Sequence, residues 1–267
     1  MATNPTFGCL LINALRLKDK KIQISQSGGG GEKNGAPGPY RFISPNTKKK
    51  AEEELNETEE TRNSSIEELR ELISDKNLKC RTDDAFLLQF LRARKFNVKK
   101  ACTRLETLNH IFMKSYSDVF ADCDIGKVRK IFQSGFGSHL PYRDEEGAAV
   151  IFIKMSNWDA NKYDIISVIN YLTLLMLSAL DEPVTQVSGL HVFLDLSGTT
   201  LQHVRCLTPR FLYLVAKGCR DTFPVRYKAF HLFNASPAFH YIWAVLKFFL
   251  TAKFKKGINL QRFPFIN

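Results

Sequence analysis

Residues 221–256 read DTFPVRYKAFHLFNASPAFHYIWAVLKFFLTAKFKK, and this stretch decides how the rest of the chain is interpreted. Its first half predicts a turn at Pro224 and a strand over 229–233, followed by a corner at 234–237 and then a helix. In that helix apolar residues recur every three or four positions, which places them on one broad face. They are Phe239, Ile242, Trp243, Leu246, Phe249 and Leu250.

Positive charge accompanies this helix, and no Asp or Glu follows Asp221 in the chain. The basic residues near its far end are Lys247, Lys253, Lys255 and Lys256. A helix of this kind suits a membrane interface, because apolar side chains enter the acyl boundary while each cation gains roughly 1 kcal/mol near an anionic leaflet. An ordinary core helix with solvated lysines is the alternative interpretation.

The composition is that of a folded, basic protein. Of its 267 residues 44% are hydrophobic and 21 are phenylalanines, which is enough for a substantial core. The net charge of +11 favours attraction to polyanions, either nucleic acid or acidic lipid. The six cysteines form no CxxC pair, so we expect a reducing, cytosolic setting without a disulfide framework or zinc site. Apolar runs stop short of the ~20 residues that span a bilayer.

The rest of the chain predicts a tail, a helical bundle and an α/β lobe. Residues 1–62 contain a glycine run, several prolines and blocks of charge, which predict a flexible, disordered tail. Helical periodicity from Ser64 onward predicts a small bundle over 63–135. Over 136–256 short β-branched runs alternate with helical patterns, which is typical of βαβ units and a largely parallel sheet. The predicted strands are 149–153, 190–196 and 229–233.

No catalytic motif stands out. The sequence has no GxSxG elbow, HExxH helix or GxGxxG turn after a strand. His191 and His231 fall inside predicted strands and Asp195 at a strand end, where structural roles are sufficient. An enzyme, for instance a lipid-modifying hydrolase, is therefore not expected, nor is a metal or cofactor.

Four stretches, in the same order along the chain, resemble the CRAL-TRIO lipid-binding domain. The resemblance is strongest to the group of the alpha-tocopherol transfer protein, the cellular retinaldehyde-binding protein and the clavesins. The stretches are DDAFLLQFLRARKFNVKKA at 83–101, NWDANKYD at 157–164, GLHVFLDLSG at 189–198, and 221–256. This resemblance implies an α/β fold class, in which an N-terminal helical bundle precedes a mostly parallel sheet with flanking helices. A lid helix matching 237–253 would cover an apolar pocket.

The resemblance also assigns residues to a site. The pocket would be lined by Ile169, Leu172, Thr173, Met176, Leu190, Leu194 and Phe230, beneath the six lid residues named above. The basic cleft that meets phosphoinositide headgroups would be carried by Arg94, Arg226, Lys228 and Lys253, with Lys255 nearby.

The C-terminus departs from the family pattern. Where the family continues through another strand and a wrapping segment, this chain reads GINLQRFPFIN over 257–267. Gly257 stands where a lysine or arginine is usual. We therefore expect the last strand and the C-terminal wrap to be missing, the lobe over 136–256 to be incomplete and 257–267 to be a divergent tail. A splice variant or an incomplete gene model would explain this, and an exposed sheet edge would reduce stability.

The first hypothesis is a monomeric cytoplasmic carrier of one small hydrophobic ligand. It would dock transiently on endosomal or other intracellular membranes through phosphoinositides, without a nucleic-acid partner. A cavity lined by Leu, Ile, Met and Phe would accept tocopherol, a retinoid or a phospholipid tail, so the ligand stays open. The alternatives are a polyanion or nucleic-acid binder driven by net charge, and a truncated form without transfer activity.

Overall fold

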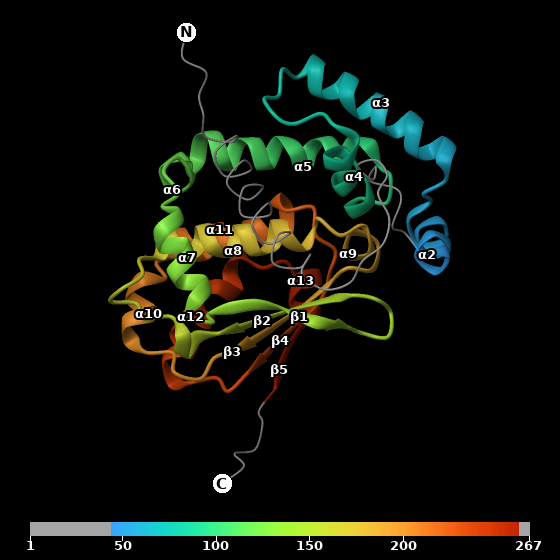
Figure 1. Cartoon of the computed structure of the whole chain (residues 1–267). Coiled ribbons are helices and arrows are strands. Elements are labelled where there is room, and N and C mark those ends of the chain that lie inside the picture. Colours follow the sequence, from blue (N-terminus) through green and yellow to red (C-terminus); the bar gives the residue numbers. More distant parts are fainter. Residues whose placement is uncertain (1–43, 262–267) are drawn as a thin grey trace, which may run out of the picture.

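A computed structural model describes residues 44–261 as a group of helices packed above an α/β lobe (Figure 1). Residues 1–43 and 262–267 lie outside the described part, so the expectations of a flexible N-terminal tail and a divergent C-terminal tail stay predictions there. In chain order the first helical segments are α2 Pro45–Leu55, α3 Glu59–Asp75, α4 Asp84–Ala93, α5 Val98–His110, the π-helical turn η1 Ile111–Ser115, α6 Ser117–Phe120 and α7 Ile125–Gln133.

The expectation of a flexible tail is wrong for residues 45–62, which belong largely to α2 and the start of α3. Ser44 caps α2 by accepting a hydrogen bond from the Thr47 amide, and Pro45 occupies the first turn, where its fixed φ is favourable. The lysine and glutamate blocks that suggested a tail lie four residues apart on this helix and form ion pairs. Composition missed α2 because few of its side chains are buried and apolar.

Two buried arginines join the N-terminal helices to the lobe. Arg92, at the end of α4, donates hydrogen bonds to the Glu57 carboxylate at 2.6 and 2.8 Å and to Gln186 Oε1 at 2.6 Å. Arg104 on α5 donates to two main-chain oxygens in the segment 220–223, both at 2.8 Å. Burying a guanidinium costs free energy that hydrogen bonds to acceptors offset, so these bonds fix where the helices sit on the lobe.

The lobe is built on a five-stranded sheet with the order β1-β2-β3-β4-β5. β1 is antiparallel to β2, and the other neighbours are parallel. The predicted fold class, N-terminal helices followed by a mostly parallel sheet, is confirmed. The strands are β1 Gly137–Arg143, β2 Ala149–Lys154, β3 Leu190–Asp195, β4 Tyr227–Phe233 and β5 Ile258–Gln261.

The expectation that the last strand is missing is wrong, because β5 pairs with β4 in parallel. Ile258 lies opposite Phe230 and Leu260 opposite Leu232, which continues the apolar face of β4. The Phe230 amide donates a hydrogen bond of 2.8 Å to the Gly257 carbonyl at the start of this pairing. The sequence reasoning failed here because four residues of alternating polarity are too short to stand out as a strand.

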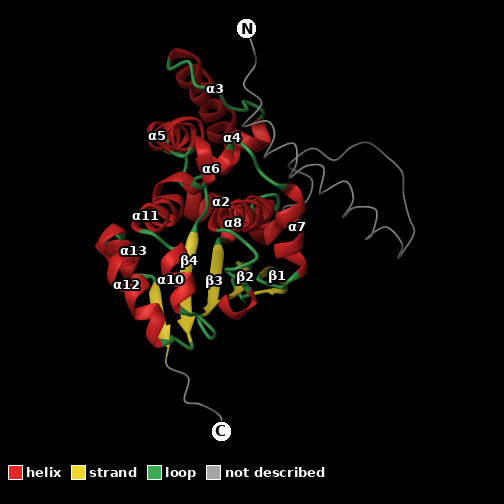
Figure 2. Ribbon diagram, turned by 90° about the vertical axis from the view of Figure 1, so that its left-hand side faces the viewer, coloured by secondary structure: helices red, strands yellow, loops and turns green. Residues whose placement is uncertain are grey.

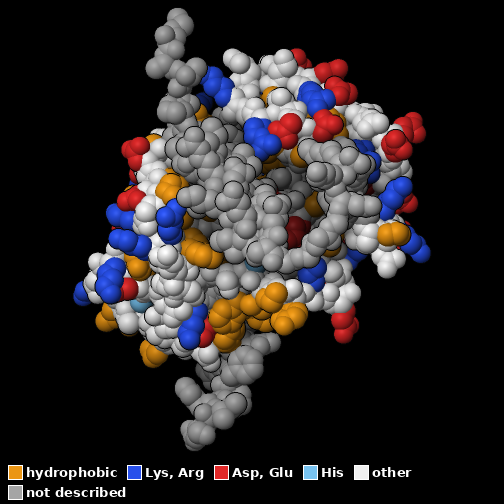
Figure 3. All heavy atoms as spheres, in the orientation of Figure 1, with side chains coloured by type: hydrophobic (Ala, Val, Ile, Leu, Met, Phe, Trp, Pro, Cys, Tyr) orange, Lys and Arg blue, Asp and Glu red, His pale blue; other side chains and the backbone are white. Residues whose placement is uncertain are grey.

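Helices cover one face of the sheet (Figure 2). Side chains alternate along each strand, so Val192 and Leu194 face the helices, while His191 and Phe193 contact His231 on the opposite face. In the space-filling view, hydrophobic side chains gather over the strands and charged side chains over the helices (Figure 3). The remaining helical segments are η2 Met155–Asn157, α8 Ile165–Ala179, α9 Pro183–Ser188, α10 Leu201–Cys206, α11 Pro209–Lys217, the π-helical turn η3 Gly218–Thr222, α12 Pro237–Phe249 and α13 Ala252–Lys256.

Candidate functional site

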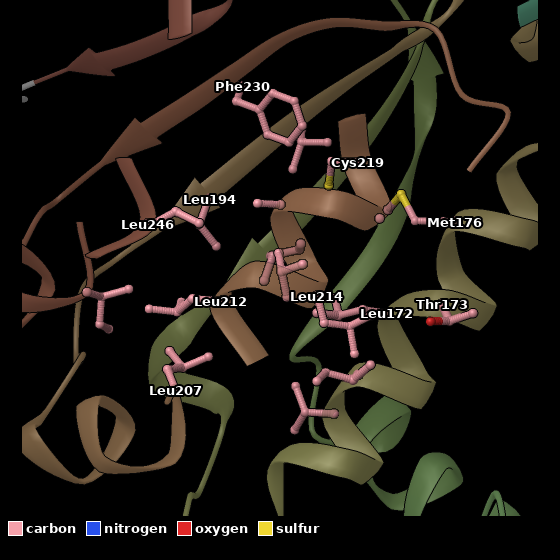
Figure 4. Close-up of a pocket in the computed structure, with 18 of the residues that line it drawn as sticks. Leu172, Thr173, Met176, Leu194, Leu207, Leu212, Leu214, Cys219, Phe230 and Leu246 are labelled. Carbon is pink, nitrogen blue, oxygen red and sulfur yellow. The ribbon is translucent and has the colours of Figure 1, made fainter. Parts of the chain in front are cut away.

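An apolar cavity of about 250 Å³ lies between the sheet and the helices α8, α11 and α12 (Figure 4). The sheet contributes side chains from β2, β3, β4 and β5, and the helices close the cavity from the other side. Among the described residues that line it, none carries a charge. A cavity of this kind is suited to a hydrophobic molecule.

Six of the seven residues predicted to line a pocket do line this cavity: Ile169, Leu172, Thr173, Met176, Leu194 and Phe230. Leu190 does not, and its assignment is corrected. It shares a sheet face with Val192 and Leu194 but stands at the start of β3, where its side chain is completely buried in the core. Strand alternation identifies the face of a side chain but not its depth along the strand.

The helix predicted to be a lid is α12, and five of its six predicted residues face the cavity: Phe239, Ile242, Trp243, Leu246 and Leu250. Phe249 does not line it and is corrected. Its ring instead packs edge to face against Tyr213 of α11, with the ring centroids 5.4 Å apart. It joins α12 to its neighbour helix, so it holds the lid from the side.

Hydrogen bonds hold α12 at both ends. Ser236 caps the helix by accepting from the Phe239 amide at 3.4 Å, and its hydroxyl donates to the Thr199 carbonyl at 2.9 Å. At the other end, Arg220 Nη1 donates to the Phe249 carbonyl at 2.7 Å. Movement of α12 away from the sheet would therefore break defined contacts at its two ends, besides exposing its apolar face.

A few polar groups gather at the part of the cavity between α8, η3 and β4. They come from Thr173, Cys219 and Tyr227, and the Tyr227 hydroxyl donates to Met176 Sδ at 3.6 Å. Burial raises the pKa of Tyr227 well above its usual value and that of Cys219 to about 11. Both groups are therefore neutral at physiological pH and can serve only as uncharged hydrogen-bonding partners.

Sequence reasoning missed Tyr227 because β4 is irregular. Leu190 pairs with Tyr227, but the next residue, His191, pairs with Ala229, so β4 holds one extra residue at Lys228. Such a bulge reverses the alternation, which turns Tyr227 to the same face as Phe230. The cavity lining contributed by α11 and η3 was also missed, since no motif marks it: Leu212, Leu214, Val215, Ala216, Gly218, Cys219 and Thr222.

Arg226 and Lys228, two of the predicted headgroup-binding cations, each pair with a carboxylate, and Lys50 joins the two pairs into one network. Arg226 Nη2 is 2.9 Å from Glu54 Oε2 of α2, and its Nη1 donates to the Val187 carbonyl. Lys228 Nζ is 2.8 Å from Glu146 Oε2, in the turn between β1 and β2. The network carries the two predicted cations, but each already has a carboxylate partner.

The other three predicted cations lie outside that network of ion pairs. Arg94 is half-buried, and its Nε finds no hydrogen-bond partner among the described residues. Burial lowers the pKa of Arg94, against the opposing attraction of Asp221. Lys253 and Lys255 are exposed on α13, whose Phe254 packs on Phe230 with ring centroids 5.1 Å apart. Among the described residues, no single network of contacts includes all five predicted cations.

Aromatic side chains are exposed on the outer face of α12. Tyr241 is 64% exposed and Phe248 is 79% exposed, and Lys247 Nζ lies 5.6 Å from the Phe248 ring centroid. Large exposed aromatic residues beside lysines are typical of surfaces that contact membranes. Within residues 44–261, no helix is long and apolar enough to cross a membrane.

Comparison with known proteins identifies the family. The CRAL/TRIO domain matches residues 133–262, and the CRAL/TRIO N-terminal domain matches residues 48–107. Clavesin-2 from Mus musculus is 32% identical over 225 residues, which cover 82% of this chain and 68% of that protein. This chain belongs to the CRAL/TRIO family. The resemblance seen in its sequence is thereby confirmed.

Two further similarities complete the comparison. A human protein named alpha-tocopherol transfer protein-like is 32% identical over 219 residues, covering 81% of this chain and 64% of that protein. Among solved structures, the one titled "Crystal structure of Sfh5" is 10% identical, with a TM-score of 0.44 and coverage of 82% of this chain and 81% of that one. Membership in the CRAL/TRIO family supports a lipid-binding or lipid-transfer role at that general level.

Proposed function

We propose that this CRAL/TRIO protein carries one small hydrophobic ligand in the cavity beneath α12 and delivers it at phosphoinositide-bearing membranes. The observation that carries the proposal is the uncharged cavity of about 250 Å³ closed by an amphipathic helix. We further propose that it acts in the cytoplasm as a monomer and contacts endosomal or other intracellular membranes transiently.

The cavity favours a tocopherol- or retinoid-like ligand with a single neutral polar group. No cation lines the described cavity, so a buried carboxylate or phosphate would lose its hydration without gaining a counter-charge. A hydroxyl or carbonyl group can instead bond to Thr173, Cys219 or Tyr227. The charged headgroup of a phospholipid would have to stay outside.

Docking would use the outer side of the lid together with the basic residues. The exposed rings of Tyr241 and Phe248 would enter the headgroup boundary, and the lysines of α13 would meet anionic headgroups. Opening requires that the membrane bind the open form more tightly than the closed form, since only differential affinity shifts the population. Exposure of Ile242 and Trp243 to the bilayer would supply such a difference.

Tryptophan fluorescence offers a direct test, because both tryptophans of the chain, Trp158 and Trp243, line the cavity. Retinol should quench their emission by energy transfer with a saturable, one-to-one profile. Retinoic acid has the same hydrocarbon chain but carries a carboxylate, and it should bind at least tenfold more weakly. Equal or tighter binding of retinoic acid would contradict the neutral-ligand proposal.

A further inference from the structure

Two carboxylates pair with the predicted headgroup-binding cations, and the role inferred for them rests on the docking function proposed above. Glu54 pairs with Arg226 at 2.9 Å, and Glu146 pairs with Lys228 at 2.8 Å. Lys50 connects the two pairs, with its Nζ 3.8 Å from Glu54 Oε1 and 3.7 Å from Glu146 Oε2. The five side chains therefore form one continuous chain of alternating charge.

We infer that Glu54 and Glu146 are internal competitors for the headgroup-binding cations, and that they restrict docking to membranes whose headgroups carry several phosphates. Lys50 becomes a third cation of the site once these carboxylates are displaced. No motif in the sequence assigns any of these three residues to the site.

The charge balance explains the selectivity. Three cations and two carboxylates leave a single net positive charge in the network. A headgroup with one negative charge can replace only one carboxylate, and it exchanges one ion pair for another with little gain. A headgroup with several phosphates brings more negative charge than both carboxylates together, and its oxygens can accept charge-assisted hydrogen bonds from all three cations at once.

The placement of the two carboxylates allows this exchange. Glu54 stands on α2, which is anchored by the buried Ala51 and Leu55, yet its own side chain is partly open to solvent. Glu146 is exposed in the turn between β1 and β2. Either side chain can turn away by rotation, without unfolding the element that carries it.

Both carboxylates are charged at neutral pH. The hydrogen bond from Arg226 lowers the pKa of Glu54, and the hydrogen bond from Lys228 lowers the pKa of Glu146. Because both groups stay ionised well below pH 7, the competition is present under cellular conditions.

The test compares vesicle binding of the full chain and of the double variant Glu54→Gln, Glu146→Gln. Phosphatidylcholine vesicles carry either phosphatidylserine or phosphatidylinositol bisphosphate, matched in total surface charge. The matched control is Glu53→Gln, Glu145→Gln, which changes the net charge equally at the neighbouring exposed positions. Circular dichroism melts confirm that all three proteins fold.

The wild type should prefer the bisphosphate vesicles. Two partly exposed ion pairs of ordinary strength predict that the Glu54/Glu146 variant binds phosphatidylserine vesicles about three- to tenfold more tightly, with a smaller preference between the lipids. The Glu53/Glu145 control should keep the wild-type preference. If both double variants gain equally, net charge and not competition is responsible, and the inference is overturned while membrane docking stands. If neither wild type nor variant binds any vesicle, both the inference and the docking proposal fail.

Soluble inositol trisphosphate, measured by calorimetry, separates headgroup recognition from attachment to the bilayer. Competition predicts that the free headgroup also binds the Glu54/Glu146 variant more tightly than the wild type. Equal affinity for the free headgroup, with a gain on vesicles alone, would mean that the carboxylates merely repel the membrane surface, which overturns the inference.

Discussion

Arg92→Met should be among the most destabilising single substitutions in the N-terminal helices. Glu57 is 1% exposed and Arg92 is 2% exposed, and they share two hydrogen bonds in the interior. Without Arg92 the buried carboxylate loses both of these hydrogen bonds and, among the described residues, keeps a contact with Arg62 Nε at 3.1 Å. Loss of one partner of a buried ion pair costs about 3–5 kcal/mol. For a protein of this size that predicts a fall in melting temperature of about 6–20 °C.

The assay is thermal and urea denaturation followed by circular dichroism. The double variant Glu57→Leu, Arg92→Met should recover at least half of the lost stability, because the buried carboxylate is removed together with Arg92. Arg81→Met is the control: it breaks the exposed pair with Asp83 and should cost less than about 1 kcal/mol. A loss below about 1 kcal/mol for Arg92→Met, or a double variant no more stable than the single one, would refute the reasoning.

Three further predictions concern pH, the lid and membrane contact. The hydrogen bond from Arg226 lowers the pKa of Glu54 below the ordinary value of 4.5. The ion pair therefore stabilises the fold fully above pH 4.5, and this stabilisation is lost as the pH falls through the lowered pKa. The difference in unfolding free energy between wild type and Glu54→Gln should therefore disappear in acid. Ser236→Ala removes a helix cap and the bond to Thr199, which should cost about 0.5–2 kcal/mol and speed hydrogen exchange in α12 if the lid is held there. Phe248→Ser should weaken vesicle binding roughly tenfold or more, whereas Phe132→Ser, which removes an exposed ring on α7, should not.

The sequence predicted the architecture well, because strong periodic patterns mark its main elements. Ile169, Met176 and Leu194, which the family resemblance assigned to a pocket, line one cavity, whereas periodicity alone indicates only the face on which a side chain lies. Elements with weak sequence patterns were not predicted. α2 has a small buried face and β5 is four residues long. The Glu54–Arg226 ion pair ties α2 to the lobe, and pairing with β4 holds β5.

Side-chain pairing between distant segments could not be predicted from one sequence. The partners Glu54 and Arg226 are 172 positions apart, and Glu146 and Lys228 are 82 apart. The four basic residues Arg226, Lys228, Lys253 and Lys255 looked unopposed because no acidic residue follows Asp221 in the chain. The fold brings carboxylates to the first two from earlier segments, which local charge patterns do not reveal.

Native mass spectrometry of the protein purified from cells, combined with lipid extraction, tests the central claim most directly. Wild type and Phe193→Trp should each carry one neutral lipid per chain, because Phe193 lies on the sheet face away from the cavity. Leu194→Trp, one position along, fills the cavity and should remain folded but empty. Absence of lipid from the wild type, or equal lipid content in Leu194→Trp and Phe193→Trp, would contradict a carrier that holds its ligand beneath α12.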